Sequence, residues 1–144
     1  MPDPILIHDD LELYLIRRFR ELLSSRPEPV CSDVKVDRVE PSGESSSWPA
    51  RVLIIRDDGT TDLELHTGEA SVGFTVLAGT KKSPKEAKDL AAIVRGLIDE
   101  LPSADPSNPV AAVTSRFGPV MVAENQDRAR VYITATLRVV ARAH

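Results

Sequence analysis

Three acidic pairs are the residues of this 144-residue chain whose types and spacing most resemble acid–base machinery: Asp9-Asp10, Asp57-Asp58 and Asp99-Glu100. Acid–base catalysis requires two carboxylates drawn together in one cleft. Each pair has a complete local explanation instead: the first can cap a helix, the second sits in a turn signal, and the third lies on a solvated helix end. The sequence therefore predicts no paired-carboxylate active site.

The sequence also shows no recognisable motif for metal binding, nucleophilic catalysis or phosphate binding. His8, His66 and His144 have no ligand-like spacing, and Cys31 has no neighbouring cysteine or histidine. The chain contains no G-x-S-x-G and no phosphate-binding glycine motif. Residues 79–82, Gly-Thr-Lys-Lys, precede a predicted helix and could meet an anion, but a solvated turn explains them better. We therefore expect no enzyme, no metal and no cofactor.

Composition favours one globular domain spanning residues 1–144. The hydrophobic fraction is 42% and the charged fraction is 28%, both ordinary values. The net charge is −4, from 18 basic and 22 acidic residues, which does not favour a protein that grips nucleic acid by its phosphates. Neither a signal peptide nor an apolar run long enough to cross a membrane is recognisable, so we expect synthesis in a cytoplasm and no membrane contact.

Two amphipathic helices are predicted. The first covers about residues 8–25, with Asp9 or Asp10 as its cap and an apolar stripe that includes Leu11, Leu15 and Phe19. The second follows Ser83-Pro84-Lys85-Glu86, which reads as a capping box with proline at the first helical position, and continues to Leu101.

Strands fill most of the remaining chain. Asp57-Asp58-Gly59 predicts a hairpin turn, and Phe117-Gly118-Pro119 predicts a turn between two short strands. Residues 40–50 are rich in serine and flanked by prolines, which predicts a flexible loop. The predicted strands are residues 33–39, 51–56, 62–66, 70–78, 110–116, 119–123 and 129–141, of which 62–66 and 70–78 could form one strand bulged near Gly68. The fold class is α+β, an antiparallel or mixed sheet with two helices, in the order α-β-β-β-α-β-β.

Four segments of the chain resemble the tail terminator proteins of siphophages, especially those of actinobacterial phages. They are LELYLIRRFREL, RVLIIRDDGTTDLEL, ASVGFTVLAGTKKSPKEAKDLAAIVRGLIDEL and FGPVMVAENQDRARVYITATLRVVARA. The resemblance lies in the order and pattern of elements and covers most of the chain. One departure is Leu77-Ala78, where family members often carry an aromatic residue, followed by a basic connection over residues 79–83.

The resemblance implies a structural virion protein without enzymatic activity. Such a protein forms a homo-oligomeric ring, commonly a hexamer, on the finished tail tube. It stops tube polymerisation and offers a surface for the head–tail connector protein. DNA would pass through the lumen without specific binding, which suits the net negative charge. The chain would be made in the bacterial host cytoplasm and end up in the tail or neck of the virion.

Contacts with partners are expected at the loop over residues 40–49, the hairpin around residues 57–59 and the closing strand. The candidate interface residues are Trp48, Arg51, Asp57, Asp58 and Arg138. Trp48 has two interpretations: its ring folds back onto the domain edge, or it anchors a partner. Three alternative functions stay open: another neck, minor tail or head–tail connector subunit, a small-molecule-binding α+β domain with a pocket between sheet and helices, and an unrecognised enzyme.

Overall fold

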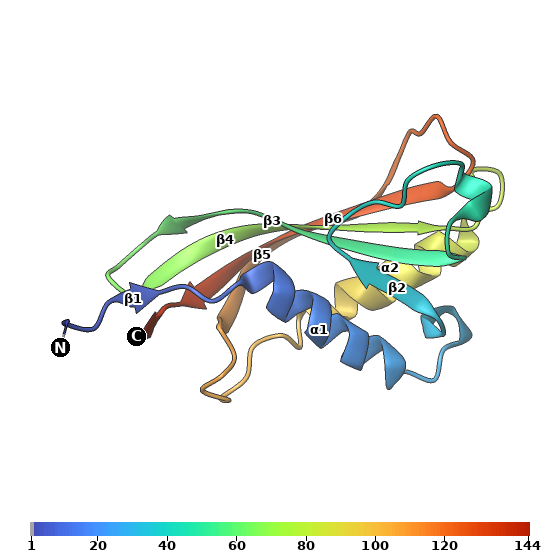
Figure 1. Cartoon of the computed structure of the whole chain (residues 1–144). Helices are drawn as coiled ribbons and strands as arrows, with labels where there is room; N and C mark the ends of the chain where they lie inside the picture. Colours follow the sequence, from blue (N-terminus) through green and yellow to red (C-terminus); the bar gives the residue numbers. More distant parts are fainter. Residues whose placement is uncertain (1) are drawn as a thin grey trace.

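Two helices cover one face of a five-stranded sheet in the computed structural model, which describes residues 2–144 (Figure 1). The helices are α1 (Leu11–Ser24) and α2 (Lys85–Ile98). The strands are β2 (Val34–Asp37), β3 (Arg51–Asp62), β4 (Thr67–Ala78), β5 (Val110–Val122) and β6 (Ala129–Val140). The predicted class, α+β, and the predicted element order are confirmed.

The sheet has the order β2-β3-β4-β6-β5, with β2 parallel to β3 and the other pairs antiparallel. Two very short strands, β1 (Leu6–Ile7) and β7 (Arg142–Ala143), pair separately and bring the two ends of the chain together. Asp9 and Arg142 reinforce this junction with an ion pair at 2.8 Å. Single 3-10 turns, η1 (Pro29–Cys31) and η2 (Ser45–Ser47), interrupt the segments that flank β2.

The core lies between the helices and one face of the sheet. On α1, the buried side chains recur at helical spacing: Leu11, Leu15, Phe19 and Leu23. On β4 and β6, every second residue faces the helices, as the pleat of a strand requires. The rings of Phe19 and Phe74 meet in this layer with centroids 5.4 Å apart. The space between the sheet and the helices is therefore filled by side chains.

The predicted cap of α1 is confirmed, because the Asp10 carboxylate accepts a hydrogen bond from the Leu13 amide at 3.0 Å.

The predicted turn at Asp57-Asp58-Gly59 is wrong, because β3 continues through these residues to Asp62. The pairing register with β4 shifts between Asp57 and Gly59, so the glycine signal marks a β-bulge. The Asp57 carboxylate accepts from the Gly59 amide at 2.9 Å, and Gly59 has a φ of +121°. The chain reverses at residues 63–66 instead, and β4 then runs unbroken from Thr67 to Ala78.

The turn predicted at Phe117-Gly118-Pro119 is also wrong, because β5 is one strand with three shifts of register against β6. The closing strand, at which contacts with partners are expected, offers no free edge. That strand is β6, which is paired on one side with β4 and on the other with β5. β5 and β2 form the two edges of the sheet.

The capping box predicted at Ser83-Pro84-Lys85-Glu86 does not form. Helix α2 begins at Lys85 after Pro84, and among the described residues no side chain caps its first turn. The Ser83 amide bonds back to the Thr80 hydroxyl at 3.0 Å, while the Glu86 carboxylate forms an ion pair with Arg51. The carboxylate that would complete the box is therefore engaged by a residue distant in the sequence.

Candidate interaction surfaces

Trp48 lies over one end of the sheet face opposite the helices. Its ring packs against Val52, Ile54 and Leu77, a small apolar cluster separate from the main core. The indole Nε1 donates to the Ser42 carbonyl at 3.1 Å. Of the two interpretations of Trp48, the structure has the ring folded back onto the sheet, where it shields apolar side chains from water.

Arg128 fastens the segment that contains Trp48. Its guanidinium donates to the carbonyls of Pro49 and Ala50 at 2.8 Å, and to those of Ser45 and Trp48 at 3.2 Å. Charge-assisted hydrogen bonds of this kind are stronger than neutral ones. Residues 40–50 are thus attached to the β5–β6 turn. The predicted flexibility of this loop stays a prediction. Sequence reasoning missed Arg128, because a basic residue in a polar turn carries no signal of its carbonyl partners.

Arg130 sits beside this attachment, on the same face of the sheet. Its guanidinium lies 2.7 Å from the Glu124 carboxylate and also pairs with Glu40. The hydrogen bond from Arg130 lowers the pKa of Glu124 below its ordinary range. This cluster joins the β5–β6 turn to residue 40 and so holds the first end of the loop that carries Trp48, while Arg128 holds its last residues.

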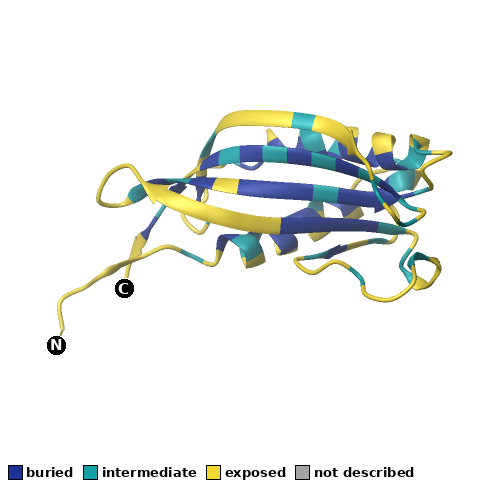
Figure 2. Cartoon of the chain, turned by 90° about the horizontal axis from the view of Figure 1, so that it is seen from above, coloured by how far each residue is buried: buried dark blue, intermediate teal, exposed yellow. Residues whose placement is uncertain are grey.

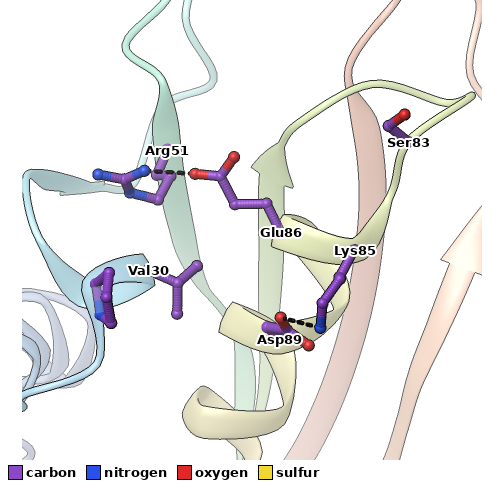
Figure 3. Close-up of a pocket in the computed structure, with 7 residues that line it drawn as sticks. Val30, Arg51, Ser83, Lys85, Glu86 and Asp89 are labelled. Carbon is purple, nitrogen blue, oxygen red and sulfur yellow. Dashed lines mark hydrogen bonds and ion pairs between the residues drawn. The ribbon is translucent and has the colours of Figure 1, made fainter.

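Arg51 ties three elements together rather than projecting toward a partner (Figure 3). Its Nε donates to the Ser32 carbonyl at 2.9 Å, and its guanidinium pairs with Glu86 on α2. The start of β3 is thereby joined to η1 and to the first turn of α2. With an exposed side-chain fraction of 19%, Arg51 presents little surface to another chain.

Asp57 and Asp58 lie on the far half of β3, where the strand extends past β2. Every residue from 56 to 66 is exposed there (Figure 2). The Asp57 amide donates to the Glu12 carboxylate at 3.0 Å, and Asp58 lies 3.6 Å from Arg56. These carboxylates therefore belong to a projecting acidic hairpin.

Arg138 lies on β6, also on the sheet face opposite the helices, with Glu69 at 3.8 Å. Eight residues separate it from Arg130, and at about 3.4 Å per residue this amounts to roughly 27 Å. The five candidate residues are therefore spread along the length of the sheet and do not form one site.

The edge strand β5 exposes apolar side chains that the sequence analysis did not single out. Phe117 is 61% exposed, and Val120, Met121 and Val122 are each close to 40% exposed. The pairing register places Phe117, Val120 and Val122 opposite Thr134, Tyr132 and Arg130, on the face away from the helices. The register shifts of β5 distort its outer edge, a feature that discourages indiscriminate strand pairing.

The described residues include neither a candidate metal-binding group nor a helix that could span a membrane. Within residues 2–144, no three His, Cys, Asp or Glu side chains gather into a group that could hold a metal ion. No helix in the same range is long and apolar enough to cross a membrane. Compared with known proteins, the chain matches no protein-family model and no curated protein.

Proposed function

We propose that this chain is a structural virion protein that caps a phage tail tube as a homo-oligomeric ring, with a hexamer as the expected form. The observation that carries the proposal is the surface of the fold. An exposed hairpin projects from the body, and apolar side chains line an edge strand. Exposed apolar surface of this kind marks contacts with other protein chains.

The resemblance to tail terminators supports the same proposal, because its segments follow the helices and strands of the fold. LELYLIRRFREL lies within α1 and the second segment begins β3. The third covers most of β4 and all of α2, and the fourth covers part of β5 together with β6. The resemblance therefore follows elements that fold together, not isolated runs of similar composition.

The proposed partners are other copies of the chain, the tail tube protein and the head–tail connector protein. DNA would cross the lumen as cargo. A net charge of −4 supports weak interaction with passing phosphates, because nonspecific binding to DNA depends on neutralising them with lysine and arginine.

The proposal is tested by polymerising the tail tube protein of the same phage with and without this chain, and measuring tube lengths by electron microscopy. A terminator should stop elongation and appear as a cap at one tube end. A length distribution that is unchanged at a molar excess of the chain would refute termination. A chain that instead binds the connector, leaving the tubes unlimited, would indicate a neck or connector subunit.

A further inference from the structure

A groove runs between η1 and the outer side of α2. Two adjoining hollows of 420 and 530 Å³ form it, and they share Pro29, Val30 and Asp89. Its apolar lining comes from Pro29 and Val30 on one side and from Ala92 and Ile93 on the other. The ion pairs Arg51–Glu86 and Lys85–Asp89 lie at one end (Figure 3). We call this feature the η1–α2 groove.

The end of the molecule that carries the groove is rich in lysine. Residues 79–89 contain four lysines, at positions 81, 82, 85 and 88, against two acidic residues, Glu86 and Asp89. Each carboxylate of the groove lining has a basic partner: Glu86 pairs with Arg51, Asp89 with Lys85, and Glu28 with Arg26. All four lysines are exposed. This end of the chain therefore has an excess of positive charge beside an apolar depression.

The opposite end has the complementary properties. The hairpin of residues 57–66, here called the arm, carries four acidic residues and neither lysine nor arginine. At its tip, Leu63 is 47% exposed and Leu65 is 86% exposed. Large apolar side chains this exposed at the end of a charged projection have the character of anchors for a partner surface.

The arm cannot reach the groove of its own chain. Strand β4 leads from the arm to the lysine-rich connection, and its 12 residues at about 3.4 Å each separate the two by roughly 40 Å. The two features lie at opposite ends of the molecule (Figure 1). Any contact between them must join two copies.

We propose that the arm of one copy docks in the η1–α2 groove of the next copy. Leu63 and Leu65 pack on the apolar lining, and the acidic residues of the arm face the lysines of residues 79–88. This inference rests on the proposed function, in that it names the contact by which the ring is built. A contact between unlike surfaces is heterologous, and repeated head to tail it generates rings or filaments.

Charge also opposes the symmetric alternative, in which two arms meet about a two-fold axis. Such a dimer would place eight acidic residues together, twice the four of one arm, with one adjoining arginine per copy, Arg56, to compensate them. Two lysine-rich ends would repel each other likewise. Only the head-to-tail arrangement brings opposite charges together.

The test uses two variants, each defective in one half of the contact. The arm variant carries Leu63→Ser and Leu65→Ser, which are exposed positions whose change leaves the core intact. The groove variant is Ala92→Glu, an exposed helical position at which glutamate keeps the helix but fills and charges the groove. Leu13→Ser and Ala104→Glu are the matched controls, because both positions are exposed and lie outside the arm and the groove lining.

Sedimentation velocity at increasing protein concentration should show self-association of the wild type and of both controls. Each variant alone should associate at least tenfold more weakly. An equimolar mixture of the two variants should restore a species of twice the chain mass and nothing larger. This outcome follows because the mixture contains one intact arm and one intact groove per pair.

Three results would overturn the inference: a wild type that stays monomeric, a variant that associates as the wild type does, or a mixture that stays monomeric while circular dichroism shows both variants folded. The tube assay keeps this inference separate from the proposed function. Restored pairing with unlimited tube growth would refute termination and keep the contact. Variants that still cap tubes normally would refute the contact and keep termination.

Discussion

Arg130 and Glu124 form an ion pair at 2.7 Å that joins the start of the β5–β6 turn to the start of β6. Both side chains are about four-fifths shielded, with exposed fractions of 19% and 20%. A pair shielded to this extent is screened less by salt than a surface pair. Arg130 also pairs with Glu40, so the same guanidinium holds the loop that carries Trp48.

Glu124→Gln should lower the free energy of unfolding by about 1 kcal/mol at pH 7, because it removes a charge-assisted hydrogen bond. Arg130 lowers the pKa of Glu124 in the folded chain. The stabilisation is therefore complete above the pKa of the unfolded chain, at about pH 4, and is lost as the pH falls through the folded value. Urea unfolding at pH 7 and pH 2.5 should show the difference from wild type shrinking toward zero. The control is Glu44→Gln, an exposed position in the loop that carries Trp48, which should have little effect on stability at either pH. If Glu124→Gln lost the same stability at both pH values, the ion pair would not be the cause.

Arg128→Ala should release the segment around Trp48, because four carbonyls lose their common donor. We expect a loss of about 2 kcal/mol in the free energy of unfolding. Trp48 is the single tryptophan, so fluorescence reports on this segment directly. The emission should shift to the red and acrylamide should quench it more strongly. Arg38→Ala, an exposed arginine near the same loop, should leave emission and stability unchanged; unaltered emission in Arg128→Ala would show that the loop is held by other contacts.

The two helix starts give opposite predictions for similar substitutions. Asp10→Ala should cost about 1 kcal/mol of stability, because the Asp10 carboxylate accepts from the Leu13 amide. Ser83→Ala should change stability by less than about 0.5 kcal/mol, because among the described residues no side chain caps α2. Thermal unfolding of both variants measures the contrast. A loss of about 1 kcal/mol in Ser83→Ala would show that the capping box forms in solution.

The contrast between these helices illustrates what sequence could predict. Apolar spacing located both helices, because Leu11, Leu15 and Phe19 can share a face only in helical geometry. The same reasoning located the long strands and hence the fold class. The capping box failed because Glu86 has a competing partner, Arg51, which lies 35 positions away and which no local pattern reveals.

Turns and surfaces were harder to predict for a related reason. A glycine after two aspartates serves a hairpin turn or a bulge equally well, and pairing of β3 with β4 up to Asp62 decided between them. The candidate interface residues Trp48 and Arg51 could be proposed from residue type alone. In the structure, Trp48 contacts the cluster around Leu77, and Arg51 contacts Ser32 and Glu86. These contacts join segments that are distant in the sequence, so no local pattern predicts them.

Gly118 and Gly96 make the last matched pair of predictions. At Gly118, φ is +95° and an added Cβ would lie 2.5 Å from the Tyr132 carbonyl oxygen, so the backbones of β5 and β6 would have to separate. Gly118→Ala should therefore lower the free energy of unfolding by about 2 kcal/mol or more. At Gly96, on the exposed side of α2, no described atom outside its two chain neighbours and the local helix backbone lies within 4 Å of an added Cβ.

Gly96→Ala should accordingly stabilise the chain by about 0.5–1 kcal/mol, because alanine loses less conformational entropy than glycine on entering a helix. Chemical denaturation of the two variants beside the wild type measures both effects with one method. Gly118 allows the backbone of β5 to lie close to that of β6. Its substitution should therefore also expose the apolar side chains of Phe117 and Val120 further and raise the binding of a hydrophobic dye. If Gly118→Ala were as stable as the wild type, β5 would be able to shift at this position without loss of stability. The other residue pairs between β5 and β6 would then be sufficient to hold β5 to the sheet.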